Sequence, residues 1–527
     1  MLPVPPPMSS THRAFACPDV ILEIIEQVSP PGSSPSDCAP KARYDRRKLL
    51  AALVLVCKAF SGPATKALWS RLDSFLPLMD LFSAFDGHET VSGVFPTYMI
   101  SGDILPHELS RFRELGSFLQ AVVPPNCVCE SATTDPVVWH YLARLSGGKP
   151  LFPSLRELHW AIREPSNAEI LFLLTSSLRR LTICYGGWTH DLPEWQLSQS
   201  MLFRTIFDIA PLLTHLAVKD IHQALLPACL SNISVLRRLR MASLYEERSI
   251  DVDILRTLSS MESLEEISFG IDIDWLEEPV DFSGFSPLKK LDITVMSGSA
   301  DSARSFFNAF SSPGLRQLVL QSQSDVFNLD KISATCTMLA QRFPSLEDLT
   351  WSFLIDHGVP LETALAPLFP LRMVKVSLEF DGAPAMVRAV TDDLFAALAK
   401  AWPRLAELSI IVLHERPDAP LPKITVHTFL ALARGCPQLE TLRLPQMQSP
   451  KLEDIPGYPV LRHGLRTLVV DRLGAMDETE YAAFPLLLDR LFPDLDTTKL
   501  PAHPSFSWKR VLGGVQLCRL GRANLVS

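Results

Sequence analysis

A short apolar pattern recurs along most of the chain and limits its possible folds more than any other feature. A leucine is followed after two residues by an aliphatic residue and, two positions later, by another apolar residue. The pattern returns at intervals of about 23 to 35 residues. In an extended segment its last two positions face the same side, so each copy predicts one strand. The twelve copies begin at Leu155, Leu178, Leu213, Leu236, Leu264, Leu288, Leu315, Leu346, Leu371, Leu405, Leu439 and Leu465.

Segments with helical periodicity separate these strands, among them Glu194–Ile209, Leu329–Phe343 and Thr425–Gly435. Proline stands one or two residues before the first leucine in eight of the twelve units, where it ends the incoming helix and favours an extended neighbour. This use of proline accounts for part of the excess of 43 prolines over 23 glycines. A single strand–helix unit cannot bury its apolar face, so neighbouring units must stack.

This arrangement resembles a leucine-rich-repeat solenoid. The resemblance implies an α/β fold with parallel strands on the concave side and helices on the convex side. The sequence departs from the usual repeat because no unit has asparagine at the position that normally bonds the neighbouring turn, where Gly186 and Ile221 stand instead. A doubly wound α/β domain also alternates strands and helices, and it is the alternative, although it has no need for twelve copies of one pattern.

The side chains on either side of the second apolar position point away from the core and line the strand face. Most are polar, and the basic residues of adjacent units are predicted to form a patch for an acidic or phosphorylated segment of a partner. Ordinary solvated strand positions are the alternative. The candidate target-binding residues are Arg180, His215, Lys219, Arg238, Arg240, Lys290 and Asp292.

Three short helices are predicted before the repeats. Ile21 and Ile25 have helical spacing behind Pro18, which suits a helix start. A loop then leads to a second helix over Arg46–Phe60, which Gly62-Pro63 closes, and to a third over Ala64–Leu72. A module of this size buries little apolar surface by itself and is expected to dock on a partner.

The runs Pro18-Asp-Val-Ile-Leu-Glu-Ile-Ile25, Val54-Leu-Val-Cys-Lys-Ala-Phe60 and Leu68-Trp-Ser-Arg-Leu72 resemble an F-box. The first run departs from that pattern, because Cys17 stands where leucine is usual. The resemblance implies binding to the Skp-type adaptor of a cullin–RING ubiquitin ligase. The alternative is three helices that only cap the next domain. The adaptor-facing or supporting residues that it implies are Pro18, Leu22, Ile25, Leu53, Val56, Phe60, Trp69 and Leu72.

The chain is expected to contain five segments. They are a disordered proline-rich N-terminus (1–14), the F-box-like module (15–75), a linker or N-terminal cap (76–150), the repeats (151–475) and a C-terminal cap (476–527). The basic cluster Lys41–Lys48 is predicted to be a solvated loop beside a partner, with a nuclear address as the alternative.

Composition and motifs exclude several classes of function. A formal net charge of −9 argues against a nucleic-acid binder, and the longest apolar run, Leu49–Cys57, is too short to span a bilayer. Cys127 and Cys129 form the only close cysteine pair, which predicts no zinc site. The glycine-rich phosphate loop, the nucleophile elbow and the metalloprotease histidine pair are all missing, so neither a cofactor nor catalysis is expected. The cysteines and the lack of a signal peptide favour a reducing compartment, the cytoplasm or the nucleus.

The two resemblances together imply a substrate-recognition subunit of an SCF-type cullin–RING ubiquitin ligase. The F-box would bind the Skp-type adaptor, and through it a cullin, while the solenoid binds a target protein of unknown identity. A leucine-rich-repeat scaffold or sensor without a ubiquitin-ligase role is the alternative. An enzyme with its site between repeats is a third possibility.

Overall fold

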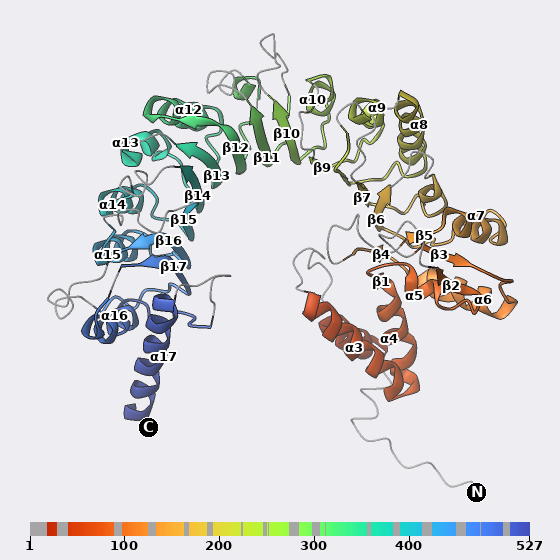
Figure 1. The fold of residues 1–527 in the computed structure, drawn as a ribbon, viewed down its shortest axis with the longest axis horizontal. Helices are drawn as coiled ribbons and strands as arrows, with labels where there is room; N and C mark the ends of the chain where they lie inside the picture. The colour runs from red at the N-terminus through yellow and green to blue at the C-terminus, as the bar shows by residue number, and fades with distance from the viewer. Residues whose placement is uncertain are drawn as a thin grey trace, which may run out of the picture. The chain divides into compact units, whose positions relative to one another are not determined.

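A computed structural model divides the chain into two compact units, residues 1–246 and residues 247–527 (Figure 1). The segment 1–14, for which disorder is predicted, and the cysteines Cys127 and Cys129 lie outside the described residues. The structure describes residues 18–28, 40–88, 97–124, 133–162, 168–186, 193–222, 225–245, 250, 252–272, 284–297, 306–310, 312–355, 360–382, 390–413, 424–448, 460–474, 476–498 and 506–526.

The first unit begins with three helices, α2 (Pro18–Val28), α3 (Pro40–Val56) and α4 (Lys58–Ser70). Helix α3 starts earlier than predicted, so the basic cluster Lys41–Lys48 is helical and the loop prediction for it is wrong. The helical structure is interrupted at Cys57, where the backbone is extended. It is not interrupted at Gly62-Pro63, which lies inside α4.

Packing explains why α4 continues through Pro63. Phe60 and Ala64 are four residues apart, so they share one helix face, and both are buried. Ending the helix at Gly62-Pro63 would separate the two side chains, so their burial outweighs the backbone hydrogen bond that the proline removes.

The first unit continues with short strands and helices. Strands β1, β4, β6, β7, β8 and β9 pair in this order, and every pair is parallel. Strands β2, β3 and β5 form a separate small sheet. The strands are β1 (Arg71–Leu72), β2 (Phe85–His88), β3 (Thr97–Ile100), β4 (Ala121–Val122), β5 (Thr133–Thr134), β6 (Glu157–Ile162), β7 (Arg180–Tyr185), β8 (His215–Lys219) and β9 (Met241–Tyr245). The helices are α5 (Leu76–Met79), α6 (Pro106–Phe118), α7 (Pro136–Leu145), η1 (Glu169–Phe172), α8 (Pro193–Ile209), α9 (Leu226–Leu230) and η3 (Ile233–Val235).

In the second unit eight strands pair consecutively, all in parallel. They lie on the inner side of the arc that this unit forms, with helices on the outer side (Figure 1). The strands are β10 (Glu266–Asp272), β11 (Lys290–Ser297), β12 (Gln317–Phe327), β13 (Asp348–Ile355), β14 (Lys375–Gly382), β15 (Glu407–Leu413), β16 (Thr441–Met447) and β17 (Thr467–Leu473). The helices are α10 (Val252–Ser259), α12 (Leu329–Arg342), α13 (Leu361–Leu365), η4 (Ala366–Leu368), α14 (Asp392–Ala401), α15 (Val426–Gly435), α16 (Glu478–Leu491) and α17 (Phe506–Val526).

The predicted α/β class, a repeat solenoid with parallel strands, is confirmed. In ten of the twelve units the strand register matches the predicted pattern, and the apolar positions of the pattern form the core. Trp160, at the third position of the first unit, is only half-buried. The eight junction prolines all lie in turns before a strand, as predicted.

The predicted register is wrong in two units. His215 pairs with Met241, so the fourth unit uses Leu239, Ala242 and Leu244, three residues later than predicted. Asp348 pairs with Lys375, so the ninth unit uses Met373, Val376 and Leu378, two residues later than predicted. Both segments are so rich in apolar residues that the pattern fits at two offsets, and only pairing with the neighbouring strand selects one.

A backbone ladder joins successive repeats within each unit. Arg179 and Arg180 both donate their backbone N–H to the carbonyl oxygen of Arg156, at 2.8 and 2.9 Å. The same pair of bonds recurs in the second unit, where Glu347 and Asp348 donate to Arg316, both at 2.9 Å. A carbonyl oxygen has two lone pairs and accepts both bonds. Both bonds of each pair come from backbone N–H groups, so the ladder tolerates the sequence variation among the units. At Arg179 the hydroxyl of Thr214 adds a third bond to the carbonyl oxygen, at 3.0 Å.

Candidate protein-binding surfaces

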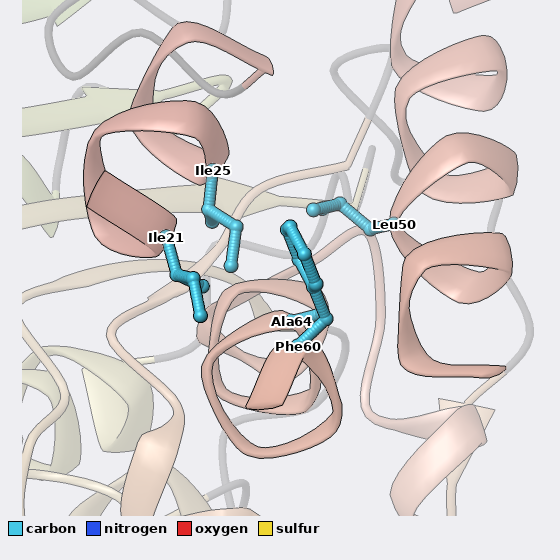
Figure 2. Packing of buried hydrophobic residues seen from close by; sticks show 5 residues of the cluster. All are labelled: Ile21, Ile25, Leu50, Phe60 and Ala64. Carbon is cyan, nitrogen blue, oxygen red and sulfur yellow. The ribbon is translucent and has the colours of Figure 1, made fainter. Parts of the chain in front are cut away.

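The three N-terminal helices enclose a small core of their own. Ile21 and Ile25 lie on one face of α2 and point toward Leu50 of α3, with Phe60 and Ala64 of α4 beside them (Figure 2). All five side chains are at most 6% exposed. The partly buried residues that pack against this core are Ile24, Leu53, Val54, Ala67 and Leu68.

The opposite faces of α2 and α3 leave apolar side chains in solvent. On α2 these are Val20 and Leu22, the latter 45% exposed. On α3 they include Leu55, 86% exposed, and Val56, 63% exposed. The second half of α3 is thus apolar around most of its circumference, which is typical of a helix with neighbours on all sides. Within the described chain it has neighbours on one side only.

The predicted adaptor-binding residues therefore fall into groups. Leu22 and Val56 are exposed, and Leu53 and Trp69 are half-buried. Ile25 and Phe60 belong to the core, and Leu72 is buried in β1, where it pairs with the sheet. Ile25 and Phe60 support the surface from within. Pro18 starts α2, as predicted.

We define the exposed residues Val20, Leu22, Leu49, Leu55 and Val56 as the apolar rim. Val20, Leu49 and Leu55 were not among the residues predicted to face the adaptor. The uninterrupted apolar run from Leu49 to Val56 was the available signal, because no single helix face can bury all of its side chains.

On the first unit's strand face, one carboxylate lies between two arginines. Glu157 in β6 is 3.4 Å from the Arg71 guanidinium and 3.9 Å from that of Arg180 in β7. Arg180 faces solvent, while Glu157 is buried. Paired in this way, Arg180 contributes less free positive charge than the sequence suggests.

Two histidines lie among the basic residues of the same face. Burial, with a smaller contribution from the nearby Lys219 ammonium, lowers the pKa of His159 to about 4. Burial also lowers the pKa of His215, as do the nearby charges of Arg180 and Arg240. Both imidazoles are therefore held toward the neutral form, and the positive charge here comes from arginine and lysine.

The shift of register moves Arg238 and Arg240 off the strand. Both lie before β9 and are exposed, and Arg240 donates its backbone N–H to Thr214 at 2.8 Å. Arg240 still lies close enough to affect the pKa of His215. Arg240 therefore lies at the edge of the strand face, just before β9 begins.

In the second unit Lys290 and Asp292 lie on β11, in register with Gln317 and Val319 of β12. The neighbouring strands carry a row of alternating charges, formed by Asp348, Lys375 and Glu407, which was not predicted. The predicted register of the ninth unit, two residues too early, did not bring Lys375 beside Asp348 and Glu407.

The charges of this row interact. The Lys375 ammonium lies 2.9 Å from the Glu407 carboxylate, which raises the lysine's pKa. Burial raises the pKa of Asp348, Glu407 raises it further, and Lys375 and Lys290 oppose this. A polar face with both signs of charge suits the recognition of a protein segment with complementary charges.

The described residues contain neither a cluster of metal-binding side chains nor a helix that could cross a membrane. Among the described residues, no three histidine, cysteine or acidic side chains gather closely enough to hold a metal ion. None of the described helices combines the length and the apolar character that crossing a bilayer requires.

Comparisons with known proteins give weak matches in structure and none in sequence. No family model matches the chain, and no curated protein does. The Rad7 and Elc1 complex in yeast is 13% identical, with 68% of this chain and 85% of that chain covered and a TM-score of 0.34. A Bacteroides fragilis protein is 15% identical, with 53% and 76% covered and a TM-score of 0.29. The TLR13–ssRNA13 complex is 14% identical, with 73% and 53% covered and a TM-score of 0.29. Similarity this low does not establish a shared function.

Proposed function

We propose that this chain is the substrate-recognition subunit of an SCF-type cullin–RING ubiquitin ligase. Its N-terminal helices bind a Skp-type adaptor, and its strand face binds a target protein. The exposure of the apolar rim on α2 and α3 supports this proposal more than any other observation, because these side chains surround a formed core and have no cover within the described chain. The resemblance of the same helices to an F-box supports the identity of the partner.

The energetics of the rim suit a stable contact. Burying a valine or leucine side chain in an interface contributes about 1.5–3 kcal/mol. Several such side chains on two adjacent helices are enough for an interface core, provided that charged groups stay at its edge. In this role the chain is not an enzyme. It increases the rate of ubiquitin transfer by holding the target near the charged enzyme.

Adaptor binding tests the proposal. Leu22→Asp with Val56→Asp places two charges in the rim without touching the core, so we expect co-purification of the full chain with a Skp-type adaptor to be lost. Leu197→Asp on α8, at a side chain 69% exposed in the same unit, is the matched control and should leave binding unchanged. Leu53 and Trp69 are poorer positions for such a test, because both are half-buried.

Three outcomes would overturn the proposal. They are failure of the unaltered chain to bind the adaptor, binding that survives Leu22→Asp with Val56→Asp, and equal loss with Leu197→Asp. Proximity labelling with the same variants then distinguishes the role of the N-terminal helices from that of the strand face. The double variant should lose ligase subunits from its neighbourhood and keep its target proteins. If the chain is a repeat scaffold without a ligase role, the unaltered chain and the double variant would both label target proteins and no ligase subunits.

A further inference from the structure

Two neighbouring rows of side chains lie on the strand face of the second unit, across β13, β14 and β15 (Figure 1). Alternate residues of a strand share a face, so both rows point away from the core, where the intervening Leu349 is fully buried. The first, which we name the charge row, consists of Asp348, Lys375 and Glu407. The second, which we name the hydroxyl row, lies two residues further along each strand and consists of Thr350, Ser377 and Ser409.

The hydroxyl row ends at a different kind of side chain on each side. Thr350 is in register with Val319 of β12, and Ser409 is in register with Arg443 of β16. The Arg443 guanidinium is occupied by the Asp471 carboxylate at 3.1 Å. Between these ends the three hydroxyl side chains are short and half-buried. The backbone of a partner can therefore approach the sheet closely here, and each hydroxyl can donate and accept a hydrogen bond.

The charge row has one cation between two carboxylates. The Lys375 ammonium pairs with Glu407 at 2.9 Å, and the two side chains are 46% and 48% exposed. An ion pair this exposed contributes little to stability, so a partner can compete for it. Asp348 is half-buried, and burial raises its pKa although Lys375 and Lys290 act in the opposite direction. A cation supplied by a partner would offset the cost of burying this carboxylate.

The spacing of the row distinguishes a helical partner from an extended one. Adjacent strands are about 4.8 Å apart, so the row spans about 9.6 Å from β13 to β15. Residues i, i+4 and i+7 of a helix lie on one face and span roughly 10.5 Å along its axis. Three residues on one face of an extended segment span about 13 Å. A helix that lies across the strands therefore presents one side chain to each strand, and an extended segment does not.

We propose that the charge row binds a helix of the target protein with basic, acidic and basic side chains at positions i, i+4 and i+7. The basic side chains face Asp348 and Glu407, the acidic side chain faces Lys375, and the helix lies over the hydroxyl row. Such complementarity provides specificity more than affinity, because the opposite order of charges places like charges together. This inference rests on the proposed target-binding role of the strand face, and it adds the class of segment that the face recognises.

Peptide binding to the full chain, without adaptor, tests the inference. The probe is a fluorescently labelled, alanine-rich helical peptide with Lys, Glu and Lys at positions i, i+4 and i+7, measured by fluorescence anisotropy at low ionic strength. One matched peptide has the same composition in the order Lys, Lys, Glu, and another has a central proline that breaks the helix. We expect saturable binding of the first peptide and about tenfold weaker binding of the other two.

Inversion of the charge row sharpens the test. Asp348→Lys with Lys375→Glu and Glu407→Lys should weaken binding of the Lys-Glu-Lys peptide about tenfold or more. The same triple variant should bind a Glu-Lys-Glu peptide about as tightly as the unaltered chain binds Lys-Glu-Lys, a gain that a misfolded protein would not show. Glu265→Lys with Lys289→Glu exchanges an ion pair of 3.0 Å outside both rows and should leave the binding of both peptides unchanged.

Four results would contradict the inference. They are the absence of saturable binding of the Lys-Glu-Lys peptide, equal binding of the Lys-Lys-Glu peptide, equal binding of the proline peptide, and no gain for Glu-Lys-Glu when the row is inverted. None of them depends on the adaptor. A chain that binds the peptide but no adaptor would contradict the ligase role alone, and a chain that binds the adaptor but not the peptide would contradict this inference alone.

Discussion

Single residues fix how closely the helices of the second unit approach. Gly435 at the end of α15 lies against α14, where a Cβ atom would be 2.7 Å from both the Cβ and the carbonyl oxygen of Ala399. No flexible side chain can yield there, because one of the two contacts is backbone. Gly513 in α17 has no neighbour within 4 Å of its would-be Cβ. The two glycines therefore serve different purposes.

Alanine at each position separates these cases. Gly435→Ala should lower the free energy of unfolding by about 1–3 kcal/mol through overpacking. Gly513→Ala should raise it by up to roughly 1 kcal/mol, because alanine favours the helix. Urea unfolding of both variants measures the difference. A Gly435→Ala protein as stable as the parent would show that the two helices move apart at no cost.

At the scale of elements, side-chain hydrogen bonds join the starts of successive helices. The Asp392 carboxylate, in the first turn of α14, accepts hydrogen bonds from the backbone N–H of Thr425 at 2.9 Å and from its hydroxyl at 2.6 Å. It also accepts one from the hydroxyl of Thr428 at 2.5 Å. Thr425 caps α15, and Thr428 is fully buried. One carboxylate thus joins two repeats.

The neighbouring Asp393 supplies the control. It is exposed and lies in the same first turn, so its charge interacts similarly with the helix dipole. Asp392→Asn should cost about 1–3 kcal/mol, because an amide cannot accept all three bonds, and Asp393→Asn should cost well under 1 kcal/mol. Thermal unfolding checks both variants, and equal midpoints would refute a role for Asp392 as a connector.

For the whole molecule, a stack of repeats must cover its last apolar layer. In the second unit α16 and α17 follow β17, and Trp508, Val511 and Val515 of α17 are fully buried. Leu517 on the same helix is 70% exposed. Without such a cap, the open end of a solenoid exposes apolar surface and aggregates.

The two faces of α17 make this testable. Val515→Asp should detach the cap and produce soluble aggregates, whereas Leu517→Asp should leave the protein unchanged. Size-exclusion chromatography with light scattering distinguishes these outcomes. A dispersed Val515→Asp protein would mean that α17 is not needed to close the stack.

The repeat follows from the amino-acid sequence alone. Its apolar period, the prolines before the strands and most core positions follow from the spacing of residues within one unit, and the structure confirms them. Tertiary structure alone decided what depends on neighbours in space. The registers at Ala242 and Val376 needed a pairing partner, because each segment offers two equivalent apolar patterns. The contact between Arg71 and Glu157 needed two strands far apart in sequence to meet. Likewise, apolar spacing predicted the N-terminal helices but could not separate buried Ile25 from exposed Val56, since that depends on which face the other helices cover.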